Sequence, residues 1–347
     1  MTIETVRGPI DESELGVIAP HEHCLIDTTF EAQVPEDPEA AELFSQPVSI
    51  NNIDVLRRNP FLVKDNMQVG DVETCIAEIS RLKKVGVSTL VDLTNFGIDR
   101  DMAMMKEVSE RTGINIIAGC GLYYSLTIGE PYRSMSVDEL AAWMIDDITN
   151  GDAKTGIKPG VIGEIGVSDV IDDLEDRSLR ASARANLATG LPIYVHTYPW
   201  SRTSVQAAEI LIEEGVRPDQ ICICHMDVEF NLEYINALFN LGVYVEFDDF
   251  GKEYYFPKTD AAFSGGPFAT DPERVRMMIK LIGEDHTDRL IIATDVCLKC
   301  LLHKYGGWGY DHIFTNIIPM MINEGMSQKD METILYENPK RFLCSRR

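Results

Sequence analysis

Short runs of apolar, β-branched residues alternate along this chain with longer segments in which apolar residues recur every three or four positions. The first pattern is typical of buried parallel strands and the second of amphipathic helices. The pattern predicts strands at residues 16–20, 88–94, 115–120, 160–165, 192–196, 220–225, 243–247 and 289–294. It predicts helices between them, among them 72–84, 102–111, 137–148, 178–188, 204–214, 231–241 and 272–282.

Eight strands with helices between them predict an α/β fold of the (β/α)8, or TIM barrel, type. Residues 27–70 are too long for an ordinary connection and predict an N-terminal insertion, either a partly helical flap or an interface element. Residues 251–271 contain Pro257 and Pro267 and predict a mobile loop over the pocket. The tail from Ile313 predicts two closing helices. We expect the whole chain, 1–347, to be a single domain.

Composition narrows the class of protein. A chain of 347 residues that is 45% hydrophobic can bury roughly three quarters of its unfolded surface. Its net charge of −25 disfavours nucleic acid and anionic membranes as partners. The sequence shows neither a secretory signal nor an apolar stretch of about 18 residues. We therefore expect a cytoplasmic protein with a small-molecule substrate.

The cysteines are expected to be reduced thiols. The eight cysteines stand in a chain without a secretory signal, which argues against a disulfide framework. Cys222 and Cys224 alternate along a predicted strand, so we expect both to face away from His225 and to pack under helices. Cys297 and Cys300 follow Asp295 and either line the pocket or fill a loop or core position.

Four of the seven histidines lie in three short motifs that resemble metal sites: His21 and His23 in APHEHCLID, His196 in IYVHTY, and His225 in ICICHMD. On an extended strand, residues i and i+2 project from one face, so His21 and His23 can reach one cation. A lone H-x-H also arises by chance, and its neighbours in the larger pattern decide the matter.

Two carboxylates complete the pattern, Glu164 in VIGEIG and Asp295 in IIATD. The six residues lie at the ends of predicted strands 1, 4, 5, 6 and 8. In TIM barrels this C-terminal face carries the chemistry. The sequence therefore predicts a hydrolytic site with two metal ions.

Several further motifs carry a resemblance to a known family: TVRGPI, LGVIAPHEH, VDLTNFGIDRD, AGCGLY, GEIG, HMD, the aspartate of ATD, and KYGGWGYDHI. Over essentially its full length the chain resembles the phosphotriesterase family of the amidohydrolase superfamily. GIKPGVIGEIG and NPFLVKDN are most similar to the phosphotriesterase-related branch. Two positions depart from the organophosphate-degrading members: Glu164 replaces a carboxylated lysine, and Ala293-Thr294-Asp295 replaces serine-histidine-aspartate.

The resemblance implies a ligand set: a deeper metal held by His21, His23 and Asp295, a more exposed metal held by His196 and His225, and Glu164 bridging the two. Imidazole and carboxylate ligands suit Zn2+ best, and Mn2+ or Co2+ also fit them. Our mechanistic hypothesis is that a metal-bridging hydroxide attacks a carbonyl or phosphoryl centre. Asp295 would take its proton as the catalytic base, or serve as a ligand alone.

Other pocket candidates have two readings each. Tyr123 either donates a hydrogen bond to a substrate carbonyl or lines the pocket. Lys252 either holds a substrate carboxylate, sulfonate or phosphate, or is a solvated lysine. Asp227, Asp248 and Asp249 either orient ligand histidines or cap a helix.

The resemblance allows lactones, carboxylic esters, N-acyl amides and phosphotriesters as substrates, and fold alone does not separate them. Glu164 and Lys252 favour a carboxylic ester, lactone or N-acyl amide. The alternatives are an organophosphate triesterase, a metal-containing binding protein without catalysis, and a metal-dependent isomerase or decarboxylase. A homodimer using residues 27–70 is our expectation for assembly.

Overall fold

A computed structural model describes residues 1–255 and 266–345. Within them, eight parallel strands surround a central core, in the chain order predicted from the sequence. Part of the predicted loop 251–271 falls on residues 256–265, outside the described residues. The barrel strands are β3 (Val17–Glu22), β6 (Val87–Asp92), β7 (Asn115–Ala118), β8 (Ile162–Val167), β9 (Ile193–Thr197), β10 (Ile221–Ile223), β11 (Tyr244–Phe247) and β12 (Leu290–Ile292).

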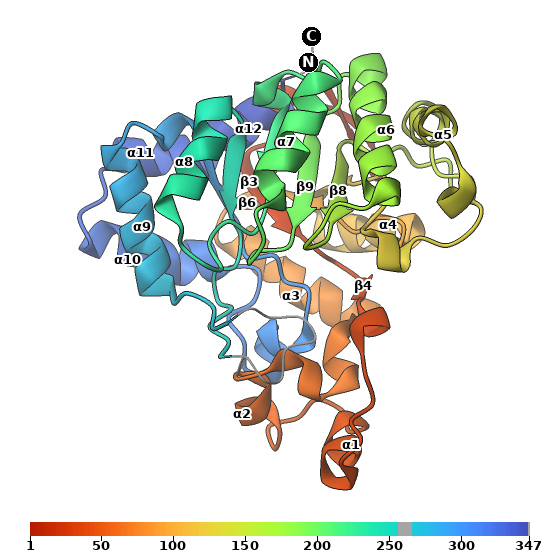
Figure 1. The fold of residues 1–347 in the computed structure, drawn as a ribbon. Coiled ribbons are helices and arrows are strands. Elements are labelled where there is room, and N and C mark those ends of the chain that lie inside the picture. Colours follow the sequence, from red (N-terminus) through yellow and green to blue (C-terminus); the bar gives the residue numbers. More distant parts are fainter. Residues whose placement is uncertain (256–265, 346–347) are drawn as a thin grey trace.

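Helices follow the strands and pack on the outside of the barrel, so the predicted TIM barrel is confirmed (Figure 1). In chain order they are α3 (Val72–Lys84), α4 (Met102–Thr112), α5 (Val137–Asn150), α6 (Asp173–Thr189), α7 (Thr203–Glu213), α8 (Leu232–Leu241) and α9 (Asp271–Gly283). Helix α6 begins five residues before the predicted start at 178. The carboxylate of Asp172 accepts hydrogen bonds from the backbone N–H groups of Leu174 and Glu175, both at 2.9 Å, and so caps the earlier turn.

The strands form two hydrogen-bonded ladders, β3–β6–β7 and β8 through β12, which meet at two seams. At the first seam, the N–H of Gly163 donates to the carbonyl of Cys120 over 2.7 Å. At the second, the side chain of Glu22 accepts from the backbone N–H of Thr294 at 3.2 Å and of Val296 at 2.9 Å. A buried carboxylate from β3 thus replaces part of the missing ladder beside β12.

The barrel interior holds a separate hydrophobic cluster that includes Ile18, Tyr194, Cys222, Cys224 and Tyr244. Our expectation that the two cysteines pack under helices is therefore wrong. The outward positions of β10 belong to Ile221 and Ile223, which join the core between the strands and the helices. His225 reaches the inner side as well because its φ of 62° breaks the alternation of the strand after Cys224.

The two ends of the barrel differ. A hairpin of β1 (Thr2–Thr5) and β2 (Gly8–Asp11) and the last helix, α12 (Asn338–Leu343), lie at the end where both termini are found (Figure 1). The tail forms two helical stretches, as predicted. A π-helical turn (Ile313–Ile317) leads into α10 (Ile318–Asn323), and a second one (Thr333–Glu337) connects α11 (Gln328–Glu332) to α12. None of the helices in the described residues is long and apolar enough to cross a membrane.

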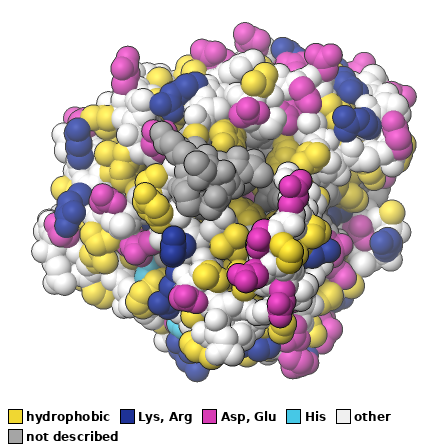
Figure 2. Space-filling view, turned by 60° about the horizontal axis from the view of Figure 1, so that its bottom comes forward, with side chains coloured by type: hydrophobic (Ala, Val, Ile, Leu, Met, Phe, Trp, Pro, Cys, Tyr) yellow, Lys and Arg dark blue, Asp and Glu magenta, His cyan; other side chains and the backbone are white. Residues whose placement is uncertain are grey.

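Residues 27–70 lie at the opposite end (Figure 1). Short strands β4 (Ile26–Asp27) and β5 (Gln68–Val69) pair antiparallel at the base of this segment, which carries α1 (Pro38–Phe44) and α2 (Ile53–Leu56). The segment is therefore partly helical. Figure 2 views the molecule from nearer this end, where hydrophobic side chains gather near the centre with acidic side chains among them.

Candidate metal centre and its pocket

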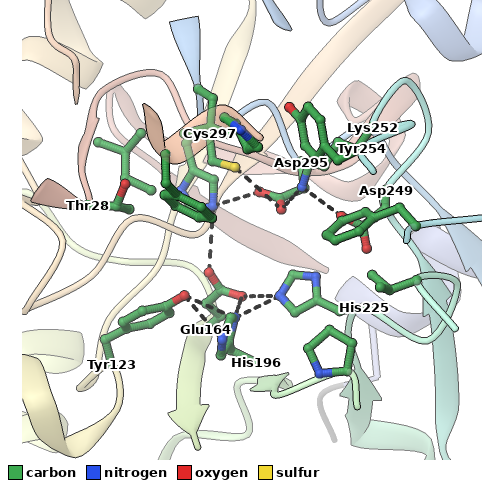
Figure 3. Close-up of a pocket in the computed structure, with 18 residues that line it drawn as sticks. Thr28, Tyr123, Glu164, His196, His225, Asp249, Lys252, Tyr254, Asp295 and Cys297 are labelled. Carbon is green, nitrogen blue, oxygen red and sulfur yellow. Dashed lines mark hydrogen bonds and ion pairs between the residues drawn. The ribbon is translucent and has the colours of Figure 1, made fainter. Parts of the chain in front are cut away.

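The six predicted ligands lie together towards the C-terminal ends of the barrel strands, with the carboxylate of Glu164 between two pairs of histidines. Figure 3 shows Glu164 with His196, His225 and Asp295 around it. One oxygen of Glu164 lies 3.3 Å from Nδ1 of His196 and 3.2 Å from Nε2 of His225. The same carboxylate lies 3.7 Å from Nε2 of His21 and 3.6 Å from Nε2 of His23. Glu164 is thus within reach of both histidine pairs.

Asp295 lies with His21 and His23. Its Oδ1 lies 3.0 Å from Nε2 of His23 and 3.7 Å from Nε2 of His21. His21, His23 and Asp295 form one set of potential donors, and Glu164, His196 and His225 form a second. These are the two sets that the resemblance implied.

Irregularities in the strands aim these side chains inward. The register of β3 against β6 shifts by one residue between Ala19 and Glu22. A similar one-residue shift occurs between Ile162 and Ile165, where β8 pairs with β9. Such bulges re-aim side chains at the rims of barrels. His21 lies within the first shift and Glu164 within the second.

Gly163 is a position where only glycine fits. Its φ is +126°, and an added Cβ would lie 2.6 Å from the carbonyl oxygen of Tyr194. Asp295 also has a positive φ, at 42°, which is uncommon for a residue with a side chain and occurs often at functional sites. The backbone therefore adopts uncommon conformations at Asp295 and next to Glu164, two of the predicted ligands.

Three of the predicted ligand histidines each have a hydrogen-bond partner on Nδ1. Nδ1 of His21 lies 2.9 Å from Glu246, Nδ1 of His23 lies 2.8 Å from Thr94, and Nδ1 of His225 lies 3.0 Å from Asp248. Such contacts orient an imidazole and direct its other nitrogen towards a metal. Asp248 was among the predicted partners, whereas Glu246 and Thr94 were not.

Buried carboxylates shape the electrostatics of the centre. Burial alone would lower the pKa of His225, but Asp248 and Glu164 hold that pKa well above its usual value. Burial would raise the pKa of Glu164, yet His196 and His225 hold it well below its usual value. By contrast, burial raises the pKa of Glu246 to about 7. These contacts favour the ionised form of Glu164.

The donor set fits divalent cations. Nε2 of His21 is buried and has no hydrogen-bond partner within the described residues, although its Nδ1 is engaged. A buried nitrogen of this kind is costly unless another group satisfies it. Four imidazoles and two carboxylates are donors that Zn2+, Mn2+ and Co2+ accept.

Tyr123 and Lys252 both line the same pocket. The hydroxyl of Tyr123 lies 3.1 Å from Nδ1 of His196. The ammonium of Lys252 contacts Asp295 and lies 2.9 Å from Oδ1 of Asp249. Only 4% of Lys252 is exposed, so it is not the solvated lysine of the alternative reading.

Asp227 and Asp249, the two other predicted partners, contact the backbone and Lys252. Asp227 accepts from the N–H groups of Asp248 and Asp249, both at 3.1 Å, and lies 2.8 Å from Nε of the fully buried Arg274. Asp227 and Asp249 therefore support the loop after β11 and Lys252. Within the described residues, Asp248 alone of these three aspartates orients a ligand histidine.

Comparisons with known sequences find relatives over nearly the full length of this chain. A sequence model described as "Phosphotriesterase family" matches residues 1–343. An N-acetyltaurine hydrolase of Xenopus tropicalis is 34% identical over 98% of this chain and 97% of the relative. A phosphotriesterase-related protein of Nematostella vectensis is 34% identical with the same coverage.

Two solved structures extend the likeness to the fold. A resiniferatoxin-binding protein from Rhodobacter sphaeroides has a TM-score of 0.94 and 32% identity, covering 99% of this chain and 94% of the other. A phosphotriesterase homology protein from Escherichia coli, with phosphate in its active site, has a TM-score of 0.77 and 27% identity, covering 96% and 100%. With a family model matched over residues 1–343 and relatives aligned over nearly all of its length, this chain belongs to the phosphotriesterase family.

Proposed function

We propose that the chain is a hydrolase that uses two divalent metal ions to cleave an N-acyl amide, a carboxylic ester or a lactone. The observation that carries this proposal is the position of Glu164, whose carboxylate lies within 3.7 Å of four imidazole nitrogens from two separate groups. A carboxylate so placed can join two cations.

The residues that would hold the ions are His21, His23 and Asp295 on one side, His196 and His225 on the other, with Glu164 shared. Bound metal ions, Zn2+ first among those that fit, would polarise the scissile carbonyl and lower the pKa of water. The remaining chemistry falls to side chains of the chain itself.

Asp295 is the proposed base. Its carboxylate would take a proton from the attacking water and deliver it to the leaving amine or alkoxide. Burial would raise the pKa of Asp295, but the neighbouring Lys252 and His23 outweigh burial and hold that pKa below its usual value. Asp295 is therefore ionised, which is the form that a base requires.

Tyr123 and Lys252 are the proposed contacts to substrate, on opposite sides of the ligand set (Figure 3). The Tyr123 hydroxyl would donate to the substrate carbonyl oxygen. The ammonium of Lys252 directs two of its three N–H donors to Asp249 and Asp295, which leaves one for an anionic or carbonyl group of the substrate.

The relatives favour the amide among these substrates, because several of them are named N-acetyltaurine hydrolases. Phosphotriester hydrolysis is the alternative, since the same centre would activate water for either reaction. The Rhodobacter structure, named for binding a toxin, favours a second alternative in which the site binds without cleaving.

A turnover panel decides among these proposals. Protein loaded with Zn2+, Mn2+ or Co2+ would be assayed on N-acetyltaurine, neutral N-acyl amines, aryl esters, lactones and a paraoxon-like triester. We expect the highest kcat/KM on an amide, ester or lactone, and loss of turnover in Asp295→Asn. Bound metal without hydrolysis of any compound would favour the binding protein. Product formed without uptake of oxygen from labelled water would instead indicate an isomerase or decarboxylase.

The cytoplasmic location and a homodimer through residues 27–70 belong to the same proposal. Both rest on the sequence alone, and size measurement in solution tests the dimer.

A further inference from the structure

The pocket above the ligand set has a polar floor and an apolar wall. Its space of about 690 Å³, part of it open to solvent, is bounded on one side by the metal ligands, Tyr123 and Lys252. The other lining residues are mostly apolar: Ile26, Pro60, Phe61, Pro199, Val228, Tyr254, Phe268 and Leu298. The reaction described above uses none of these.

Two segments far apart in sequence build this wall. Pro60 and Phe61 come from the insertion at 27–70, whereas Tyr254 and Phe268 come from the connection between β11 and α9. The segments are joined directly, because the N–H of Tyr255 donates to the carbonyl of Arg58 over 3.0 Å. Described residues of both segments therefore contribute to the wall.

The aromatic part of the wall is held in place by backbone bonds. The N–H of Phe268 donates to the carbonyl of Tyr254 over 2.9 Å, and the two rings lie 5.4 Å apart at 69°. Next to them, the N–H of Ala269 donates to the carbonyl of Val228 over 3.0 Å. The Tyr254 hydroxyl lies 3.6 Å from Sγ of Cys300, which is outside the pocket lining, whereas Tyr254 itself lines the pocket.

We propose that the substrate carries an apolar, ring-sized group beside its scissile bond, and that this group packs against Phe61, Tyr254 and Phe268. This inference rests on the proposed hydrolase function and narrows its substrate class. Removing an apolar ring from water at a preformed wall favours binding. An acetyl group offers one methyl and cannot fill such a surface.

Matched substrates test the inference. N-Acetyl and N-phenylacetyl derivatives of one amine vary the acyl side, and the acetamides of ethylamine and phenethylamine vary the other side. In at least one pair, we expect the ring-bearing compound to have a kcat/KM higher by about tenfold or more, since a single methylene is already worth on the order of tenfold in an apolar pocket.

Substitutions in the wall test whether these residues cause the preference for a ring-bearing substrate. Phe61→Ala and Phe268→Ala should each reduce the advantage of the ring to about threefold or less. Phe61→Leu should retain part of the preference for the ring-bearing compound. Phe314→Ala removes a half-buried phenylalanine outside the pocket and should leave the ratio unchanged. A smaller substrate preferred in both pairs, or a ring preference that survives both alanine variants, would overturn the inference.

Failure of the proposed function gives a different result. If no compound is hydrolysed, calorimetry can still measure the binding affinity of the same paired compounds. The ring-bearing compound of a pair should bind the wild-type protein more tightly than its partner. This difference in affinity should be lost in Phe61→Ala. Equal binding within both pairs would overturn the inference by itself.

Discussion

Oδ1 of Asp248 lies 3.0 Å from Nδ1 of His225. The other oxygen of the same carboxylate lies 3.2 Å from Nδ1 of His21. Asp248 therefore contacts one histidine from each of the two donor sets, and it couples their orientation through a single buried side chain.

Asp248→Asn should weaken metal binding by about 10- to 100-fold. Asparagine offers one acceptor oxygen, so it cannot serve both imidazoles in the way that the carboxylate does. Titration with Zn2+ against a competing chelator measures the change. The exposed Asp146 on α5 supplies the control, since Asp146→Asn should leave affinity unchanged; equal affinity in Asp248→Asn would refute the coupling.

Gly163→Ala should displace Glu164 and abolish the loading of at least one metal position. The new Cβ would meet the carbonyl oxygen of Tyr194 at 2.6 Å, at a φ of +126° that alanine rarely adopts. Gly129→Ala is the matched control, because nothing lies within 4 Å of its added Cβ. Metal content and circular dichroism of the two variants give the comparison, and normal loading of Gly163→Ala would contradict the constraint.

Lys252→Gln should raise KM for an anionic substrate more than for a neutral one of similar size. N-Acetyltaurine and N-acetylethanolamine form such a pair, and we expect their KM ratio to change by about tenfold, the effect of losing one charge-assisted hydrogen bond. Lys299→Gln, at a lysine paired with Asp65 outside this pocket, should leave the ratio as in wild type. An unchanged ratio in Lys252→Gln would restrict the lysine to pairing with Asp249 and Asp295.

Glu22→Leu should destabilise the barrel at the seam beside β12. The backbone N–H groups of Thr294 and Val296 would lose their acceptor, at about 1–3 kcal/mol each. A lower denaturation midpoint is the expected readout. The exposed Glu213 on α7 provides Glu213→Leu as the control, with an effect within about 0.5 kcal/mol; similar midpoints for both variants would argue against this role of Glu22.

The fold and the grouping of the ligands could be predicted because each depends on local pattern. Apolar runs at regular spacing predicted eight strands, and residues such as Glu164 and Asp295 stood where those strands end. The parallel strands then bring such ends together, whatever the separation in sequence.

Other features depend on contacts and backbone angles that the pattern does not express. The alternation rule placed Cys224 opposite His225, but a φ of 62° at His225 puts both side chains inside the barrel. Glu22 and Glu246 resemble any acidic residue in sequence. Their roles come from partners more than 200 residues away, Thr294 and His21.

Metal stoichiometry tests the central claim, that Glu164 joins two cations, most directly. Equilibrium dialysis with Zn2+ should give two ions per wild-type chain at saturation and at most one in Glu164→Ala at the same free metal concentration. A single ion per wild-type chain, or two ions held with unchanged affinity by Glu164→Ala, would contradict it.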